Sequence, residues 1–198
     1  VRAIQHGRAI FSMEVSFQVA EEGVQHQLPM PDVTPPEELP SLRERLESQR
    51  AEAPSGFTFY FETNRAFEDR TVDAVDPFRP EKKPPCQHTW MKPNGMLPDD
   101  VTMHQCVFAY MSDYSMSETS WRPHGLSWAQ PGVQTASLDH AIWFHRPFQV
   151  DQWLLFAQDS PAAFGSRAGS RALVYDRSGV LVASVFQESL IRRRTGSD

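Results

Sequence analysis

The segment Val101–Met116 constrains the fold most, because apolar side chains lie almost all round a helix drawn through it. Pro98-Asp99-Asp100 comes directly before it, and an Asp there can accept hydrogen bonds from the free N–H groups of a helix start. The apolar positions include Met103, Cys106, Val107, Tyr110 and Met111. A helix that is apolar on most sides has to be covered by other structure. We therefore expect this helix to be wrapped by the rest of its domain.

The covering structure is predicted to be a sheet. Strand-like runs precede the helix at Phe67–Val75 and Cys86–Lys92, and four more follow it, at Val133–Phe144, Trp153–Ala163, Arg167–Asp176 and Leu181–Ile191. Asp176-Arg-Ser-Gly179 is typical of a hairpin turn between the last two runs. Strands, one long helix and then more strands indicate an α+β fold, with an antiparallel sheet curled around the helix.

The residues before this unit differ in character. Val1–Gln5 and Ala9–Val19 read as two strands joined by a tight turn, the second of them half-buried. Prolines cluster from Leu28 to Pro40, and a short charged helix is expected from about Pro35 to about Ala51. We expect residues 1–27 to end a first domain, residues 28–55 to form a linker and residues 56–198 to form a second domain. The chain opens in mid-strand without Met, as if an upstream part were missing.

Composition excludes several classes of function. The net charge of −6 argues against a general nucleic-acid binder, whose surface would be basic. No apolar run reaches the roughly 18 residues of a membrane span, and the residues at the start do not resemble the apolar region of a signal peptide. Cys86 and Cys106 fit no metal or redox spacing and are expected to be reduced core thiols. A cytoplasmic location is the default expectation.

Polar side chains interrupt two of the apolar strands. Ser137, Asp139 and His140 occur beside Ile, Trp and Phe, and Gln187 lies in a run of Val, Phe and Leu. Burying polar groups costs free energy unless they have hydrogen-bond partners. These positions are therefore either the wall of a site or a satisfied network in the core.

Several residue strings resemble the acyl-CoA thioesterase II family, whose members have a double-hotdog fold. The strings occur over nearly the whole chain and are specific when taken together. They are Ala3–Arg8, Ser16–Gln18, Leu97–Asp100, Ala109–Asp113, Ser137–His140, Trp143–Phe148, Trp153–Leu155, Gly179–Ser184 and Gln187–Glu188. The chain matches the family only from the final strands of the first hotdog, followed by a complete second hotdog.

The resemblance implies hydrolysis of acyl-CoA to a free fatty acid and coenzyme A, with no cofactor. The family's proposed water-activating trio is an Asp at the end of the helix of the second hotdog unit, a Thr or Ser on the next strand and a Gln on the last strand. By motif these fall on Asp113, Ser137 and Gln187.

The chemistry of these side chains fits those roles. Asp113 lies in the last turn of a helix expected to be buried, where desolvation and the negative end of the helix dipole both disfavour an anion. Such a carboxylate suits a general base. Ser137 and Gln187 do not ionise usefully, but their hydroxyl and amide groups can hold a water molecule by hydrogen bonds.

Other constellations are weaker. Gly125-Leu-Ser127-Trp-Ala129 resembles a nucleophile elbow but lacks its last Gly and its strand–turn–helix setting. His140 and His145 are expected on opposite faces of a strand, which argues against a metal site or triad shared with His104 and Asp139. Asp139 and His140 are expected to support the fold or line the seam between domains. Three arginines could bind the phosphates of coenzyme A, although a solvated strand face is the simpler role for each. They are Arg146, Arg167 and Arg171.

Two rival functions stay open. One is a hotdog hydratase or dehydratase acting on acyl thioesters, which would place His104 or His140 in the pocket and turn Asp113 away. The other is a catalytically silent subunit that binds acyl-CoA or serves in assembly. A truncated first sheet would expose edge strands and apolar surface, so such a chain should recruit a partner, dimerise or be a fragment of a longer gene product. A homo-oligomer is the expectation.

Overall fold

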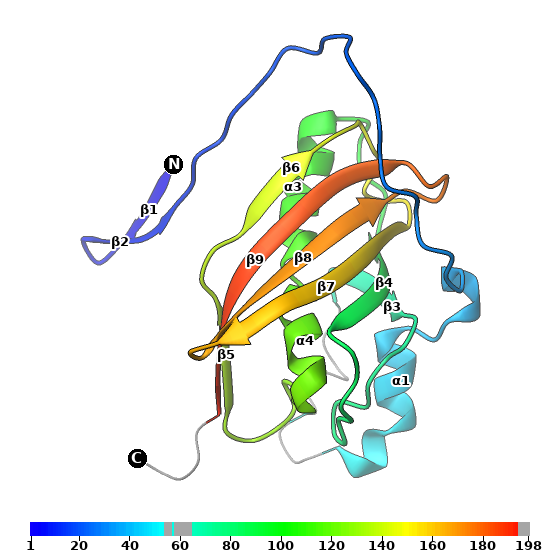
Figure 1. Ribbon diagram of the computed structural model, residues 1–198, viewed down its shortest axis with the longest axis vertical. Helices are drawn as coiled ribbons and strands as arrows, with labels where there is room; N and C mark the ends of the chain where they lie inside the picture. Colours follow the sequence, from blue (N-terminus) through cyan, green and yellow to red (C-terminus); the bar gives the residue numbers. More distant parts are fainter. Residues whose placement is uncertain (54–56, 58–64, 194–198) are drawn as a thin grey trace.

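The computed structural model describes residues 1–53, 57 and 65–193, and one curled antiparallel sheet dominates them (Figure 1). Seven strands of the described chain form this sheet in the order β3-β4-β7-β8-β9-β5, and β6 pairs with β9 beside β5. They are β3 (Phe67–Thr71), β4 (Cys86–Pro93), β5 (Val133–Ser137), β6 (Ala141–Phe144), β7 (Leu154–Phe164), β8 (Arg167–Tyr175) and β9 (Leu181–Arg193). The predicted α+β fold is confirmed.

The hairpin between β8 and β9 follows the predicted turn. Asp176 Oδ1 accepts hydrogen bonds from the backbone N–H groups of Ser178, at 2.8 Å, and Val180, at 3.0 Å. Gly179 has a φ of +85°, a conformation that favours glycine. The local sequence is therefore sufficient to specify this turn.

Two helices, α3 (Val101–Ser112) and α4 (Met116–Trp121), lie against the concave face of the sheet. Asp100 caps α3 as predicted, because its side chain accepts from the N–H groups of Thr102 and Met103. The expected single helix over Val101–Met116 is wrong at its end, since the chain turns at residues 113–115 before α4 begins. Asp and Ser side chains compete with helical hydrogen bonding, which favours a break there.

The expectation that the sheet wraps the helix on most sides is also wrong. Phe108 and Met111 are fully buried in the main core cluster under the sheet. On the other side of α3, Val101, Met103 and Tyr110 are 56%, 43% and 65% exposed. The sheet covers one face only, so the apolar character of the helix was a poor guide to its burial.

The two cysteines likewise depart from expectation. Cys86 and Cys106 are both free, but both are exposed and neither lies in the core. Cys86 begins β4, and Cys106 lies on α3. Composition alone could not show which side of either element faces the core.

The proline-rich segment packs on the convex face of the sheet. Met30, Val33 and Leu39 contact a second core cluster, formed by Trp90, Leu155, Tyr175 and Leu181. The indole N–H of Trp90 donates to the carbonyl of Thr34 at 3.0 Å. Backbone carbonyls without strand partners are thus satisfied by side chains of the sheet.

Short helices follow this segment. They are η1 (Pro36–Glu38), α1 (Leu42–Ser48) and η2 (Arg50–Glu52). The charged helix predicted from about Pro35 therefore starts later, after Pro40. Ser41 caps it, and Glu44 completes a capping box with Ser41.

The first strands, β1 (Arg2–Gln5) and β2 (Arg8–Ser12), form a separate antiparallel hairpin (Figure 1). The predicted turn is confirmed, with positive φ at His6 and Gly7. The second strand ends at Ser12 and all of its residues are exposed, so the half-buried strand expected to reach Val19 is wrong. The division at residues 27 and 55 stays a prediction, and the boundary near Gly56 lies outside the described residues.

A further expectation concerned the membrane. Within the described ranges, the structure contains no helix that is long and apolar enough to cross a lipid bilayer.

Replacing Phe108 by Ala should destabilise the domain strongly. Its ring is fully buried and lies 5.1 Å from the ring of Phe148 and 5.8 Å from that of Phe156. We expect a loss of about 3–5 kcal/mol in the free energy of unfolding in urea. Val101→Ala, at an exposed position of the same helix, should change it by less than about 0.5 kcal/mol. Equal effects of the two substitutions would contradict the burial described here.

Candidate active site

The fold brings Asp113, Ser137 and Gln187 together. They come from the C-cap of α3, the last residue of β5 and the middle of β9. The Ser137 hydroxyl donates to Asp113 Oδ1 at 2.8 Å, and Gln187 Nε2 donates to Ser137 Oγ at 3.0 Å. The three side chains therefore form one continuous chain of hydrogen bonds.

A gap in the sheet makes room for this arrangement. Both β5 and β6 pair with β9, and the chain leaves one and joins the other opposite Gln187 and Glu188. Asp139 Oδ1 accepts from the backbone N–H of Glu188 at 2.8 Å and so fixes the crossing. The single strand predicted over Val133–Phe144 is wrong, because this gap interrupts it.

Gln187 is the centre of a larger buried network. It is fully buried, and its Nε2 also lies 3.3 Å from Ser189 Oγ and 3.4 Å from Ser117 Oγ. His140 Nδ1 lies 2.6 Å from Gln187 Oε1. Because an amide oxygen can only accept, this ring nitrogen carries the proton and donates it.

His140 in turn contacts helix α3. Its Nε2 lies 2.7 Å from Ser112 Oγ, and Ser112 is buried in the last turn of α3. The histidine therefore holds Gln187 from behind and ties β9 to the helix that carries Asp113. Only the tertiary structure could reveal this link, since Ser112 and His140 lie on different elements.

The site opens into a cavity of about 360 Å³. Asp113 and Ser137 line it, whereas Gln187 lies behind Ser137 and does not. Asp113 is exposed, so the expected burial of this carboxylate is wrong. The remaining lining residues are Leu42, Arg65, Tyr114, Ser117, Glu118, Trp121, Trp128, Thr135 and Ala136.

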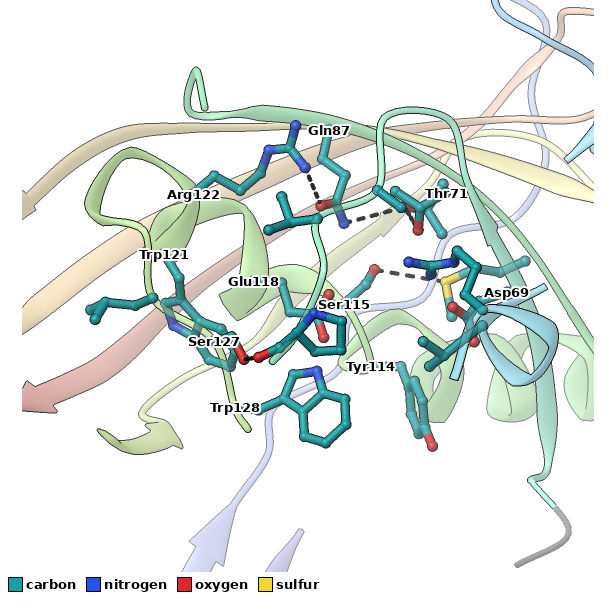
Figure 2. A pocket seen from close by; sticks show the side chains of 18 of the residues that line it. Asp69, Thr71, Gln87, Tyr114, Ser115, Glu118, Trp121, Arg122, Ser127 and Trp128 are labelled. Carbon is teal, nitrogen blue, oxygen red and sulfur yellow. Dashed lines mark hydrogen bonds between the residues drawn. The ribbon is translucent and has the colours of Figure 1, made fainter. Parts of the chain in front are cut away.

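A second cavity, of about 70 Å³, shares lining residues with the first. Figure 2 shows the side chains that line this second cavity. Glu118, Arg65 and Tyr114 line both cavities. Burial, together with the charge of Asp69, raises the pKa of the Glu118 carboxyl to about 7. The pKa of Asp69 is also raised, mainly by burial.

Sequence reasoning missed Glu118. It is the single charged residue of Met116-Ser-Glu-Thr-Ser-Trp121, within a segment whose other residues are apolar or small and polar. That contrast was a usable signal, but nothing in the sequence showed that Glu118 would line a cavity together with Asp69 of β3.

The side chains of the alternative nucleophile and histidine sites do not come together in the described structure. The Ser127 hydroxyl is buried and donates to the carbonyl of Pro77 at 2.5 Å. His104 Nδ1 accepts from the N–H of Val150, and His145 bonds Ser184, so they and His140 occupy separate places. Across the part of the chain that the structure describes, His, Cys, Asp and Glu form no group suited to a metal ion.

The candidate arginines have local partners. Arg171 pairs with Asp159 at 2.7 Å, and Arg167 lies 3.4 Å from Glu188. Arg146 donates to the carbonyl of Leu181 at 2.8 Å. These contacts agree with roles on the strand surface.

Comparison with solved structures identifies the architecture. A conserved protein with a hot dog fold from Alicyclobacillus acidocaldarius superimposes with a TM-score of 0.62 over 89% of this chain and 59% of its own, at 15% sequence identity. The curled sheet over a central helix therefore defines a hotdog-fold protein.

Sequence similarity narrows the class further. The acyl-CoA thioesterase family model matches residues 57–190. Acyl-CoA thioesterase 2 of Haemophilus influenzae is 39% identical over 97% of this chain and 67% of its own length. Human acyl-coenzyme A thioesterase 8 is 34% identical over 97% of this chain and 62% of its own. The chain thus belongs to the acyl-CoA thioesterase family.

A solved relative supports the same assignment. The crystal structure of an acyl-CoA thioesterase II from Mycobacterium marinum superimposes with a TM-score of 0.76, at 37% identity, over 99% of this chain and 68% of its own. The present chain spans about two thirds of the length of these relatives.

Gln187→Leu should test the buried network. The substitution keeps the volume but leaves His140 Nδ1 and the serine hydroxyls without their shared partner. We expect the free energy of unfolding to fall by about 1–3 kcal/mol, the usual cost of unpaired buried polar groups. Phe186→Leu, at the neighbouring and more exposed position, is the control and should cost less. Unchanged stability of Gln187→Leu in chemical denaturation would refute the network.

Proposed function

We propose that this chain hydrolyses acyl-CoA thioesters to a free fatty acid and coenzyme A, using a water molecule activated by Asp113, Ser137 and Gln187. Family membership supports the reaction class. The observation that carries the assignment of residues is the hydrogen-bond chain from Gln187 through Ser137 to Asp113, at the wall of an open cavity.

The direction of the hydrogen bonds supports a proposed role for each group. Ser137 donates its single proton to Asp113 Oδ1, so Asp113 acts as an acceptor and its other oxygen is available to a water molecule. Ser137 Oγ retains a lone pair that can accept from the same water. Gln187 lies behind the cavity wall and fixes the orientation of the Ser137 hydroxyl. Gln187 therefore acts on the water through Ser137.

The reaction needs little more than positioning and a base. Asp113 removes a proton from the water as its oxygen attacks the thioester carbonyl carbon, held at about 3–3.5 Å. Collapse of the tetrahedral intermediate breaks the C–S bond and leaves the electron pair on sulfur. Thioesters are activated acyl groups, so a covalent nucleophile is not required.

The hydratase alternative fits this geometry poorly. It requires a histidine in the pocket and Asp113 turned away. Asp113 lines the cavity, while His104 and His140 do not. His104 is instead buried against the backbone N–H of Val150. The silent-subunit alternative is separated from hydrolysis by the activity measurement below.

Asp113→Asn should abolish hydrolysis while leaving the fold intact. The amide cannot take a proton from water, and a general base contributes roughly 100-fold or more to such a step. Release of free thiol from a panel of acyl-CoAs, measured for this chain and for a version of full family length, provides the test.

Asp99→Asn supplies a control, because it removes an exposed carboxylate near the opposite end of the same helix. It should keep the parental rate. If Asp113→Asn turned over acyl-CoA as fast as the parent, the base would be another group. If the parent were inactive on every acyl-CoA in both versions, the silent-subunit alternative would hold.

A further inference from the structure

A second carboxyl group shares the cavity of the proposed base. Glu118 lines the 360 Å³ cavity together with Asp113 and Ser137, and it also lines the smaller 70 Å³ cavity. Figure 2 shows it among the other side chains that line the smaller cavity. Glu118 is therefore shared between the reaction pocket and the second cavity.

The position of Glu118 is fixed by its neighbours on α4. The hydroxyl of Ser117 lies 2.7 Å from Ser189 Oγ and 3.4 Å from Gln187 Nε2. Thr119 and Ser120 are buried on the same short helix. The segment carrying Glu118 is thus held by the network that orients Ser137.

Burial, more than the surrounding charges, favours a neutral Glu118 at moderate pH. The charge of Asp69 on β3 also opposes its ionisation. Arg45 on α1, Arg65 before β3 and Arg122 act in the opposite direction, but burial outweighs them. Two carboxyl groups in one cavity with different environments are the usual arrangement for a base and an acid.

We propose that protonated Glu118 is the general acid of the site, which gives its proton to the departing thiolate sulfur of coenzyme A. This inference rests on the proposed hydrolysis. It assigns Asp113 and Glu118 opposite roles: Asp113 takes up a proton during the cycle and Glu118 gives one away.

The proton balance closes without another reactant. Asp113 takes one proton from water as the oxygen bonds to the acyl carbon. The C–S bond then breaks, and sulfur takes the proton of Glu118. The proton on Asp113 returns to Glu118 through water in the shared cavity, and the acid and thiol leave.

Glu118→Gln tests the assignment with little change in shape. The amide resembles the neutral carboxyl but cannot give up a proton, so hydrolysis of acyl-CoA should fall roughly 100-fold. In the parent, kcat/KM should decline as the pH rises through about 7, where Glu118 loses its proton. The variant should lack that decline.

A change of leaving group separates an acid from a structural residue. In a thioester of an aromatic thiol, the leaving group departs as a stable thiolate and needs no proton. Glu118→Gln should therefore hydrolyse this substrate at close to the parental rate, whereas Asp113→Asn should be inactive on both substrates. Equal loss of Glu118→Gln on both substrates, or full activity on acyl-CoA, would overturn the inference.

Asp69→Asn tests the role of Glu118 without changing the Glu118 side chain. Removing the negative charge of Asp69 makes ionisation of Glu118 easier, so the alkaline decline should move to lower pH. An unmoved decline would argue against Glu118 as its source. An inactive parent would instead remove the proposed hydrolysis itself, so the two failures are distinguishable.

Discussion

The buried amide of Gln187 is the contact on which the candidate site depends. It lies opposite the gap where the chain leaves β5 for β6, so side chains rather than strand partners fill that place. Its oxygen accepts from His140, and its nitrogen donates to Ser137. Through these two contacts the amide joins the end of α3 to the edge of the cavity. Leaving such a group unpaired would cost about 1–3 kcal/mol, which favours one arrangement over looser ones.

The sequence predicted those turns and helix caps that depend only on residues close together in the chain. The cap at Asp100 and the turn at Asp176 follow from side chains that satisfy nearby backbone N–H groups. The resemblance pointed to Asp113, Ser137 and Gln187, whose side chains are joined by hydrogen bonds, and their catalytic roles stay a prediction. The gap between β5 and β6 could not be predicted, because it depends on how both strands pair with β9.

Burial was the least predictable property. The helix α3 carries apolar residues nearly all round, yet Tyr110 and Met103 are exposed. Asp113 was expected inside and lies at the cavity surface, while Glu118, which the sequence did not single out, has a pKa that burial raises to about 7. Sequence reports which side chains are polar, but the tertiary contacts decide which of them lose water. The assignment of base and acid therefore depends on the structure.

The most direct test of the account is a crystal structure with a non-hydrolysable thioether analogue of acyl-CoA, whose sulfur cannot be released. The account predicts the thioether in the cavity lined by Asp113 and Ser137, with one water bonded to both side chains and facing the position of the carbonyl carbon. An analogue seated elsewhere, with Asp113 and Ser137 facing empty solvent, would contradict it.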